Sequence, residues 1–115
     1  MVVDCSTEEE VDRIFRALAD TTRRDILTRA IQNEQSVSAL ARHYDMSFAA
    51  VQKHVAVLER AELVVKERHG REQIVHGNVA TLREAAALLA DYEQLWIHRA
   101  EQIASILAGR KGNTR

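Results

Sequence analysis

Several residue types are scarce or absent in this sequence. Its 115 residues include no proline, four glycines and one cysteine, and 4% of them are aromatic. The single cysteine, Cys5, excludes an internal disulfide, and the few glycines form no loop that would cradle a phosphate. We also find no nucleophile elbow and no string of metal ligands. The sequence therefore does not favour an enzyme, and we expect neither a cofactor nor a bound metal.

Long apolar runs are missing too. No stretch of about 18 apolar residues exists, which is the length that a membrane-spanning helix needs. The N-terminal region carries the acidic run Glu8–Glu10 rather than a basic and then apolar signal peptide. We therefore expect a cytoplasmic protein that makes no use of a membrane.

The chain has no excess of positive charge, since its formal net charge is −1. Taken globally this disfavours nucleic-acid binding, because DNA-binding domains are usually basic. Between residues 42 and 56, however, Arg42 and Lys53 oppose only Asp45, with His43 and His54 able to add charge. Any DNA affinity must come from the placement of these groups and from two copies of the chain. The length and the 46% apolar content predict one domain over residues 1–115.

The segment from Ser47 to Ala61 is the most informative part of the sequence for function. It predicts a helix over about 47–61, with Ser47 as N-cap and Val51, Val55 and Leu58 on one face. The opposite side carries small, amide and cationic residues: Ala49, Gln52, Lys53, Ala56 and Arg60. Small side chains permit close approach to a surface, lysine can neutralise a phosphate, and glutamine can pair with adenine. A solvated helix face would have a similar composition, so the neighbouring segments must decide.

Two helices are predicted before this region. Ser6 with Glu9, or Thr7 with Glu10, fits a capping box, and an apolar stripe then runs to about Ala19, formed by Val11, Ile14, Phe15 and Leu18. Asp20 can cap a second helix whose core-facing residues are Ile26, Leu27, Ala30 and Ile31. Arg23 and Arg24 lie near the start of that helix, where cations oppose the helix dipole. They indicate either an outside carboxylate or phosphate, or a solvated, salt-bridged pair.

Residues 33–35 are expected to form a loop, after which Ser36 can cap a short helix through Val37, Leu40, Ala41 and Tyr44. Tyr44, Asp45 and Met46 then connect to the Ser47 helix. A short helix, a tight turn and a second capped helix form the helix-turn-helix pattern. In that motif the second helix enters the major groove, with its N-terminal residues against the base edges.

After Ala61 the periodicity changes. Two β-prone runs over about 63–76 surround His69-Gly70, which predicts a hairpin with these two residues as its turn. Arg68 and Arg71 flank the tip and could reach phosphates or a narrow minor groove, as the wing of a winged helix would. The alternative is that these charges only protect an exposed sheet edge.

A last long helix is predicted over about 79–108, with Asn78 as its cap and Gly109 at its end. Leu82, Leu89, Trp96 and Ile103 recur every seven residues, and Tyr92 occupies the companion heptad position. We expect a dimer through terminal helices, formed by Phe15, Leu82, Leu89, Tyr92, Trp96 and Ile103. The alternative is a core helix that packs across its own domain. The fold class is mainly α with a small β-hairpin (α+β), a winged helix-turn-helix.

The chain resembles the ArsR-type winged helix-turn-helix repressors of bacteria and archaea. The resemblance rests on FRALADTTRRDIL (15–27), on VSALARHYDMSFAAVQKHVAVLERAELV (37–64) and on HGREQIV (69–75). It implies a homodimer that binds double-stranded DNA at a partly palindromic operator, with Ser47, Gln52, Lys53 and His54 at the recognition-helix contacts. The candidate DNA-binding residues are therefore Ser47, Phe48, Ala49, Gln52, Lys53, His54, Arg68 and Arg71.

The sequence departs from the family pattern at several points. Thr21 stands where relatives usually have proline, and Glu62 where they have glycine. Residues 35–40 lack the Cys-x-Cys pair of many metal sensors, and the last helix does not space its acids and histidine as metal-binding relatives do, at Asp91, Glu93, His98 and Glu101. The Tyr92-to-Trp96 pattern is similar to a metal-less subgroup. A repressor that responds to a metal, or to oxidation of Cys5, remains an alternative.

The leading hypothesis from the sequence is a dimeric, sequence-specific transcriptional repressor. A second hypothesis is a winged helix that binds proteins and not DNA. The net negative charge and the acidic wing residues Glu67 and Glu72 favour this second hypothesis slightly.

Overall fold

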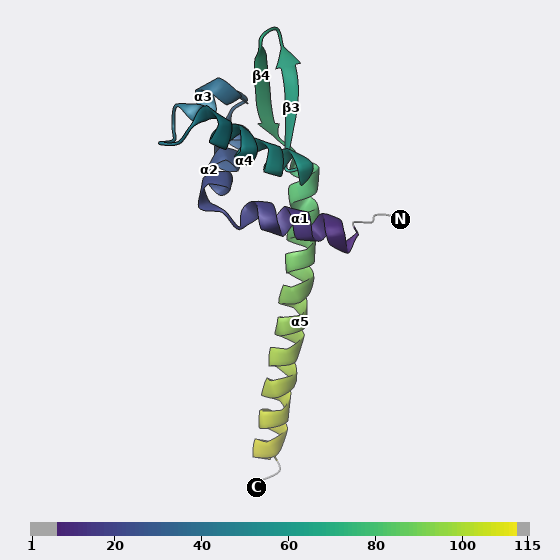
Figure 1. Ribbon diagram of the computed structural model, residues 1–115. Coiled ribbons are helices and arrows are strands. Elements are labelled where there is room, and N and C mark those ends of the chain that lie inside the picture. Colours follow the sequence, from purple (N-terminus) through teal and green to yellow (C-terminus); the bar gives the residue numbers. More distant parts are fainter. Residues whose placement is uncertain (1–6, 113–115) are drawn as a thin grey trace. The chain divides into compact units, whose positions relative to one another are not determined.

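The computed structural model describes residues 7–112, and side-chain environments through residue 109. Figure 1 shows a mainly helical chain with a small β-sheet. The elements are α1 (Glu8–Leu18), α2 (Thr21–Gln32), β2 (Gln35–Ser36), α3 (Val37–Ala41), α4 (Phe48–Arg60), β3 (Val64–His69), β4 (Glu72–Gly77) and α5 (Val79–Gly112). The chain divides into two compact units, the first ending at Arg83 and the second beginning at Glu84, within α5. No helix in the described part is long and apolar enough to cross a membrane.

The predicted helix starts are confirmed by their caps. Thr7 and Glu10 form the capping box of α1, so the second of the two pairings is the one observed, and Ser6 lies outside the described residues. The Asp20 carboxylate accepts from Arg23 N at 3.0 Å, and the Ser36 hydroxyl accepts from Ala39 N at 3.0 Å. Each cap satisfies an amide that the helix leaves without a partner, worth about 1 kcal/mol apiece.

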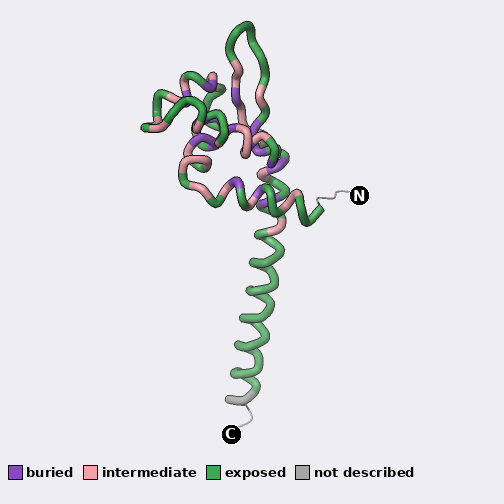
Figure 2. The backbone as a smooth tube through the Cα atoms, viewed as in Figure 1, coloured by how far each residue is buried: buried purple, intermediate pink, exposed green. Residues whose placement is uncertain are grey.

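The core of the first unit lies where α2, α3 and α4 meet the sheet, and α1 packs against α2 and α4. Its largest fully buried side chains are Ile26, Leu40, Val51, Val55, Leu58, Leu63, Val64 and Val75. In Figure 2 the buried stretches, drawn in purple, recur along the part of the chain that precedes the long exposed stretch of α5. Burying each such side chain contributes about 1.5–3 kcal/mol to the stability of the fold. The part of the chain that precedes the heptad pattern of α5 therefore has a core of its own.

One predicted core residue is wrong. Ile31 is 50% exposed. It lies in the last turn of α2 and its Cγ1 would be 2.7 Å from a Cβ placed on Gly77, so the isoleucine covers the bare backbone at the end of β4. A side chain at this position would force Ile31 to shift, which favours glycine.

The sheet has three antiparallel strands in the order β2-β4-β3. The hairpin is confirmed, but part of the predicted loop over 33–35 is strand, because Gln35 pairs with Val75 and Ser36 with Ile74. The tip is also one residue further along than predicted. His69 pairs with Glu72, so the turn residues are Gly70 and Arg71, and Gly70 supplies the positive φ of +64°.

The end of α4 is a Schellman motif, the hydrogen-bond pattern that closes many helices. Leu63 N donates to Leu58 O at 3.0 Å and Glu62 N donates to Glu59 O at 2.9 Å. Glu62 sits at the left-handed position with φ +61°, the only non-glycine residue with positive φ in the described chain. Glu62 therefore adopts the left-handed conformation that glycine adopts readily, at a steric cost.

The last helix starts as predicted and ends later. Asn78 Oδ1 accepts from Ala80 N at 3.2 Å, at the first turn of α5. The helix continues through Gly109 to Gly112, because a single glycine weakens a helix by only about 1 kcal/mol and need not end it.

Candidate nucleic-acid interface

The N-terminal part of α4 presents an exposed face built by its helical periodicity. Val51, Val55 and Leu58 are buried, which turns the intervening positions outward. The exposed residues there include Ser47, Phe48, Ala49, Gln52 and Lys53. Phe48 is 47% exposed although it is a large apolar side chain. A hydrophobic ring beside an amide and a cation is the combination that can read thymine methyl groups, base edges and phosphates.

The Ser47 hydroxyl has two roles available. Its oxygen accepts a hydrogen bond from Ala50 N at 3.1 Å, so it caps the helix. Because the hydroxyl oxygen is the acceptor in this contact, its O–H remains able to donate to a phosphate. The cap also leaves the positive end of the helix dipole at the exposed face, where it favours an anion.

The turn before α4 is held by a side-chain cluster that sequence reasoning missed. The helix α3 ends at Ala41, three residues earlier than predicted, and Tyr44 lies in the connection to α4 that it was predicted to begin. The Tyr44 hydroxyl donates to Asp25 Oδ2 at 2.5 Å, and Arg29 Nε donates to the same oxygen at 2.9 Å. The hydrogen bond from Tyr44 is the main reason that the pKa of Asp25 lies below its ordinary value. No local pattern links residues 19 positions apart, so only the fold reveals this tie.

The two faces of the wing differ in charge. Side chains alternate along a strand, so Lys66 and Arg68 share one face of β3 while Glu67 and His69 share the other. Lys66 pairs with Glu59 at 3.5 Å, and Arg68 Nε donates to Gly70 O at 3.2 Å across the tip. Arg71 is exposed in the turn itself. The structure therefore places Arg68 and Arg71 together at the tip, as predicted.

One acidic residue of the wing, Glu67, contacts two histidines of the same hairpin. Glu67 Oε1 lies 2.5 Å from His76 Nε2, and this hydrogen bond is the main cause of the lowered pKa of Glu67. Glu67 also lies 3.9 Å from His69 Nε2. The carboxylate is thus flanked by two imidazoles, which offset its charge when they are protonated.

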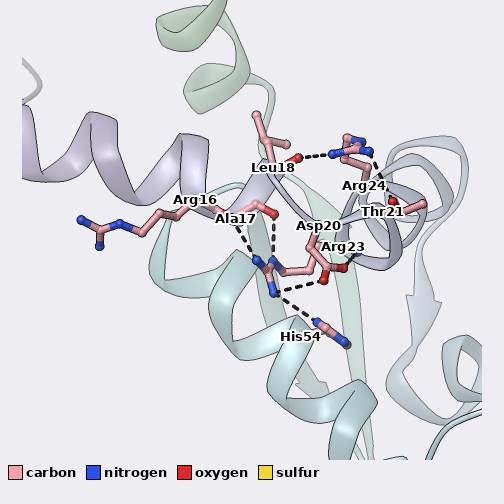
Figure 3. A network of polar contacts seen from close by, with 8 residues as sticks. All are labelled: Arg16, Ala17, Leu18, Asp20, Thr21, Arg23, Arg24 and His54. Atoms are coloured by element: carbon pink, nitrogen blue, oxygen red, sulfur yellow. Dashed lines mark hydrogen bonds and ion pairs between the residues drawn. The ribbon is translucent and has the colours of Figure 1, made fainter.

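The two arginines near the start of α2, Arg23 and Arg24, form hydrogen bonds with other groups of the protein. Arg23 Nε donates to Ala17 O at 2.8 Å and its Nη2 to Arg16 O at 2.9 Å, while Arg24 Nη1 donates to Leu18 O at 2.6 Å. Figure 3 shows both guanidinium groups turned toward the end of α1. Of the two alternatives, the contacts favour partners within the protein over an outside carboxylate or phosphate, since Arg23 also pairs with Asp20 at 3.9 Å. The arginines bind carbonyls in the last turn of α1, among them that of Arg16, which also accepts from Ala19 N at 3.2 Å.

His54 belongs to the same network. It is half-buried, and its Nδ1 lies 3.3 Å from Arg23 Nη1. The histidine is thus separated from the freely exposed group formed by Ser47, Phe48, Ala49, Gln52 and Lys53. Whether it takes part in binding depends on the nitrogen that faces away from Arg23.

The residues predicted for dimer contacts have different environments. Phe15 and Leu82 are half-buried, whereas Leu89, Tyr92, Trp96 and Ile103 are exposed along α5 in the single chain. Tyr92 is 62% exposed and Trp96 is 70% exposed. Figure 2 shows most of α5 as exposed. Among residues 7–112, no three His, Cys, Asp or Glu side chains are grouped so that they could hold a metal ion.

Comparison with known proteins gives the class of the molecule. No protein-family model matches the sequence. Over 109 residues the chain is 32% identical to the HTH-type transcriptional regulator Rv2034 of Mycobacterium tuberculosis, covering 95% of this chain and 99% of the relative. It is 25% identical over 75 residues to the transcriptional repressor SdpR of Bacillus subtilis, covering 65% of this chain and 83% of that protein.

A solved structure agrees in fold and in sequence. The chain superimposes on an ArsR-like transcriptional regulator from Rhodococcus sp. RHA1 with a TM-score of 0.75 and 34% identity, covering 85% of this chain and 92% of that one. The molecule is therefore a winged helix-turn-helix transcriptional regulator, as the fold and the α4 face indicate. It belongs to the ArsR family, which confirms the family resemblance seen in the sequence.

Proposed function

We propose that this regulator acts in the cytoplasm as a homodimeric repressor that binds an imperfect inverted repeat in double-stranded DNA. The observation that carries the proposal is the exposed N-terminal face of α4, where Phe48, Ala49, Gln52 and Lys53 lie together beside a capped helix end. In a helix-turn-helix protein this is the part of the recognition helix that meets the bases.

Each residue of this face has a distinct chemical role. Gln52 can form two hydrogen bonds with adenine, and Phe48 and Ala49 can contact thymine methyl groups. Lys53 and the Ser47 hydroxyl bind phosphates, which position the helix without reading sequence. The tie between Tyr44 and Asp25 supports this arrangement, because it holds the turn that sets where α4 begins.

The wing supplies further phosphate contacts in this proposal. Arg71 lies exposed at the tip and Arg68 beside it, so both can reach a backbone or a narrow minor groove. Together with Lys53 they concentrate positive charge at the binding face, which offsets the formal net charge of −1 over the whole chain.

The dimer is supported by the apolar strip of α5. Leu89, Trp96 and Ile103 follow one another at heptad spacing, and all three are more than 40% exposed in the single chain. A long exposed strip of this kind is stabilised by pairing with a second helix. Two-fold symmetry would then present two copies of α4 to half-sites about one helical turn, or a multiple of it, apart.

Repression follows from occupancy of the DNA. A dimer bound over a promoter blocks access of other proteins to the same duplex, and no further chemistry is needed. The relative SdpR, a transcriptional repressor, supports this direction of regulation.

The proposal is tested by mixing the purified protein with fragments of genomic DNA, sequencing what it retains, and repeating the selection at low and moderate salt. We expect recovery of one imperfect inverted repeat with steep loss of binding as salt rises. Uniform, weak recovery would contradict sequence-specific binding. It would favour the alternative of a protein-binding winged helix, which the acidic Glu67 and Glu72 of the wing would suit.

A further inference from the structure

We infer that Arg23 is a positioning residue for DNA binding, because it holds His54 in the one neutral form whose Nε2–H faces outward as a donor for a DNA phosphate. The inference rests on the proposed DNA-binding function and adds a residue of α2 to it. Its physical basis is the network that Figure 3 shows between the end of α1, the start of α2 and α4.

Arg23 is held firmly before it meets His54. Its Nε and Nη2 donate to Ala17 O and Arg16 O at 2.8 and 2.9 Å, and its Nη1 lies 3.9 Å from Asp20 Oδ2. The side chain is only 18% exposed. With three anchors and little solvent around it, the guanidinium has a fixed direction, and Nη1 is the nitrogen that it offers to α4.

The chemistry of the contact decides the tautomer of His54. A guanidinium nitrogen can only donate, since arginine is not deprotonated in proteins. Its partner, His54 Nδ1 at 3.3 Å, must therefore be the acceptor. A neutral imidazole with Nδ1 unprotonated carries its proton on Nε2.

The position of His54 makes that proton useful. The two ring nitrogens point in widely different directions, so Nε2 faces away from Arg23 when Nδ1 faces it. Within residues 7–112, no group accepts a hydrogen bond from His54 Nε2. His54 directly follows Lys53 on α4 but is turned about 100° around the helix from it. A donor at Nε2 would therefore reach a phosphate at the edge of the exposed face, and not the phosphate that we assign to Lys53. Hydrogen bonds to charged groups are the stronger kind, and a prealigned donor loses little entropy on binding.

The first test measures the tautomer in the free protein. Heteronuclear NMR of the full chain with 15N-labelled histidine, assigned with a His54 variant, should show the Nε2–H form. In Arg23→Gln the signals should move toward a mixture of tautomers. Arg24→Gln is the matched control, because Arg24 also binds an α1 carbonyl, Leu18 O, and does not touch His54. A wild-type His54 protonated on Nδ1 would overturn the inference.

The second test measures binding to a fluorescein-labelled, mixed-sequence duplex of about 30 base pairs, enough for two half-sites a helical turn apart. Asn places its amide near the position of Nδ1, whereas Gln places a donor near Nε2. We expect His54→Gln to bind close to wild type and His54→Asn to bind about tenfold more weakly. Equal binding by the two variants would overturn the inference, because no donor at Nε2 would be needed.

The third test separates positioning from folding. Arg23→Gln should weaken duplex binding about as much as His54→Asn, and the double variant should be no weaker than either, since both act on one contact. Circular dichroism and thermal unfolding monitor the fold, with Arg24→Gln as the comparison. Additive losses would mean that Arg23 acts independently of His54 and would overturn the inference. A wild-type protein that binds no duplex even at low salt would instead overturn the proposed function, and the positioning role with it.

Discussion

The Tyr44 hydroxyl donates a hydrogen bond to Asp25 Oδ2 at 2.5 Å, and this contact ties the turn of the helix-turn-helix to α2. Arg29 binds the same carboxylate oxygen at 2.9 Å and lies 6.0 Å from the centre of the tyrosine ring. The side chains of Arg42, His43 and Asp45 are exposed, and the backbone N–H groups of Arg42, His43 and Tyr44 donate to carbonyls of α3. The Tyr44 side chain therefore adds a tertiary contact to a turn that the backbone bonds hold locally.

Tyr44→Phe should lower the free energy of unfolding by about 1–2 kcal/mol, because it removes a hydrogen bond to a charged acceptor. Urea unfolding followed by circular dichroism measures the loss. In combination with Asp25→Asn, the total loss should be smaller than the sum of the two single losses, since both variants break one contact. Strict additivity would show that the contact contributes nothing of its own.

The same cluster predicts how stability depends on pH at both extremes. The hydrogen bond from Tyr44, and then that from Arg29, lower the pKa of Asp25. Its contribution is therefore present above the unfolded value of about 3.9 and is lost as pH falls through the lower folded value. Burial, and then the hydrogen bond to Asp25, raise the pKa of Tyr44 to about 12. Its contribution is present below the unfolded value of about 10 and is lost as pH rises to the folded one.

Urea unfolding across both pH ranges checks these two losses. Tyr44→Phe should abolish the alkaline loss that the tyrosine causes and weaken the acid one. Identical pH profiles for wild type and Tyr44→Phe would contradict the assignment.

Glu62→Gly should raise the free energy of unfolding by about 0.5–1 kcal/mol. Glu62 has φ +61°, where a Cβ is sterically disfavoured and glycine is not, although glycine loses more entropy on folding. Thermal unfolding measures the gain. Glu62→Ala is the matched control: it keeps the Cβ, so its stability should stay near that of wild type. If alanine stabilised as much as glycine, the carboxylate and not the backbone strain would be responsible.

Leu89→Glu and Trp96→Glu should shift the protein from dimer to monomer, because each places a charge in the apolar strip of α5. Analytical ultracentrifugation measures the change. Trp96, the sole tryptophan in the sequence, also reports pairing through its own fluorescence, which should shift to the blue as the concentration of the wild-type protein rises. Gln94→Glu adds the same charge at the outermost heptad position and should leave the dimer intact. Dissociation by all three variants alike would place the interface elsewhere.

Lys53→Ala and Gln52→Ala should affect DNA binding in different ways. Loss of Lys53 should weaken binding to all sequences and reduce the slope of the salt dependence by about one phosphate contact. Loss of Gln52 should relax the preference at one base position and leave the salt slope unchanged. Selection from a randomised duplex library, with titrations over salt, distinguishes the two. An unaltered base-preference profile in Gln52→Ala would remove that residue from sequence readout.

Much of the fold could be predicted because its signals are local. The caps at Thr7, Asp20, Ser36 and Ser47 each involve a hydrogen bond to the residue three positions ahead, so a short stretch of sequence contains both partners. The face of α4 was predictable for the same reason, since the spacing of Val51, Val55 and Leu58 decides which side is buried.

Several of the differences depend on groups that the tertiary structure brings together. A strand of two residues, Gln35–Ser36, has no periodicity and exists only because β4 lies beside it. Ile31 fits the apolar pattern of α2, yet it covers Gly77 at the sheet edge. By sequence the arginines of α2 fit a ligand site, but in the structure they bind carbonyls at the end of α1, six residues before them.

The sequence by itself determined the order of the helices, the capped start of α4 and the apolar heptads of α5, because hydrogen bonds and periodicities within a few residues are written in the chain. Only the tertiary structure decided that Arg23 binds α1 carbonyls and His54 and that Tyr44 forms a hydrogen bond with Asp25. It also decided that Glu62 adopts a left-handed backbone conformation. The physical reason is that a polar side chain binds whatever unsatisfied group the fold brings within about 3 Å, and its own neighbours in sequence do not specify that group.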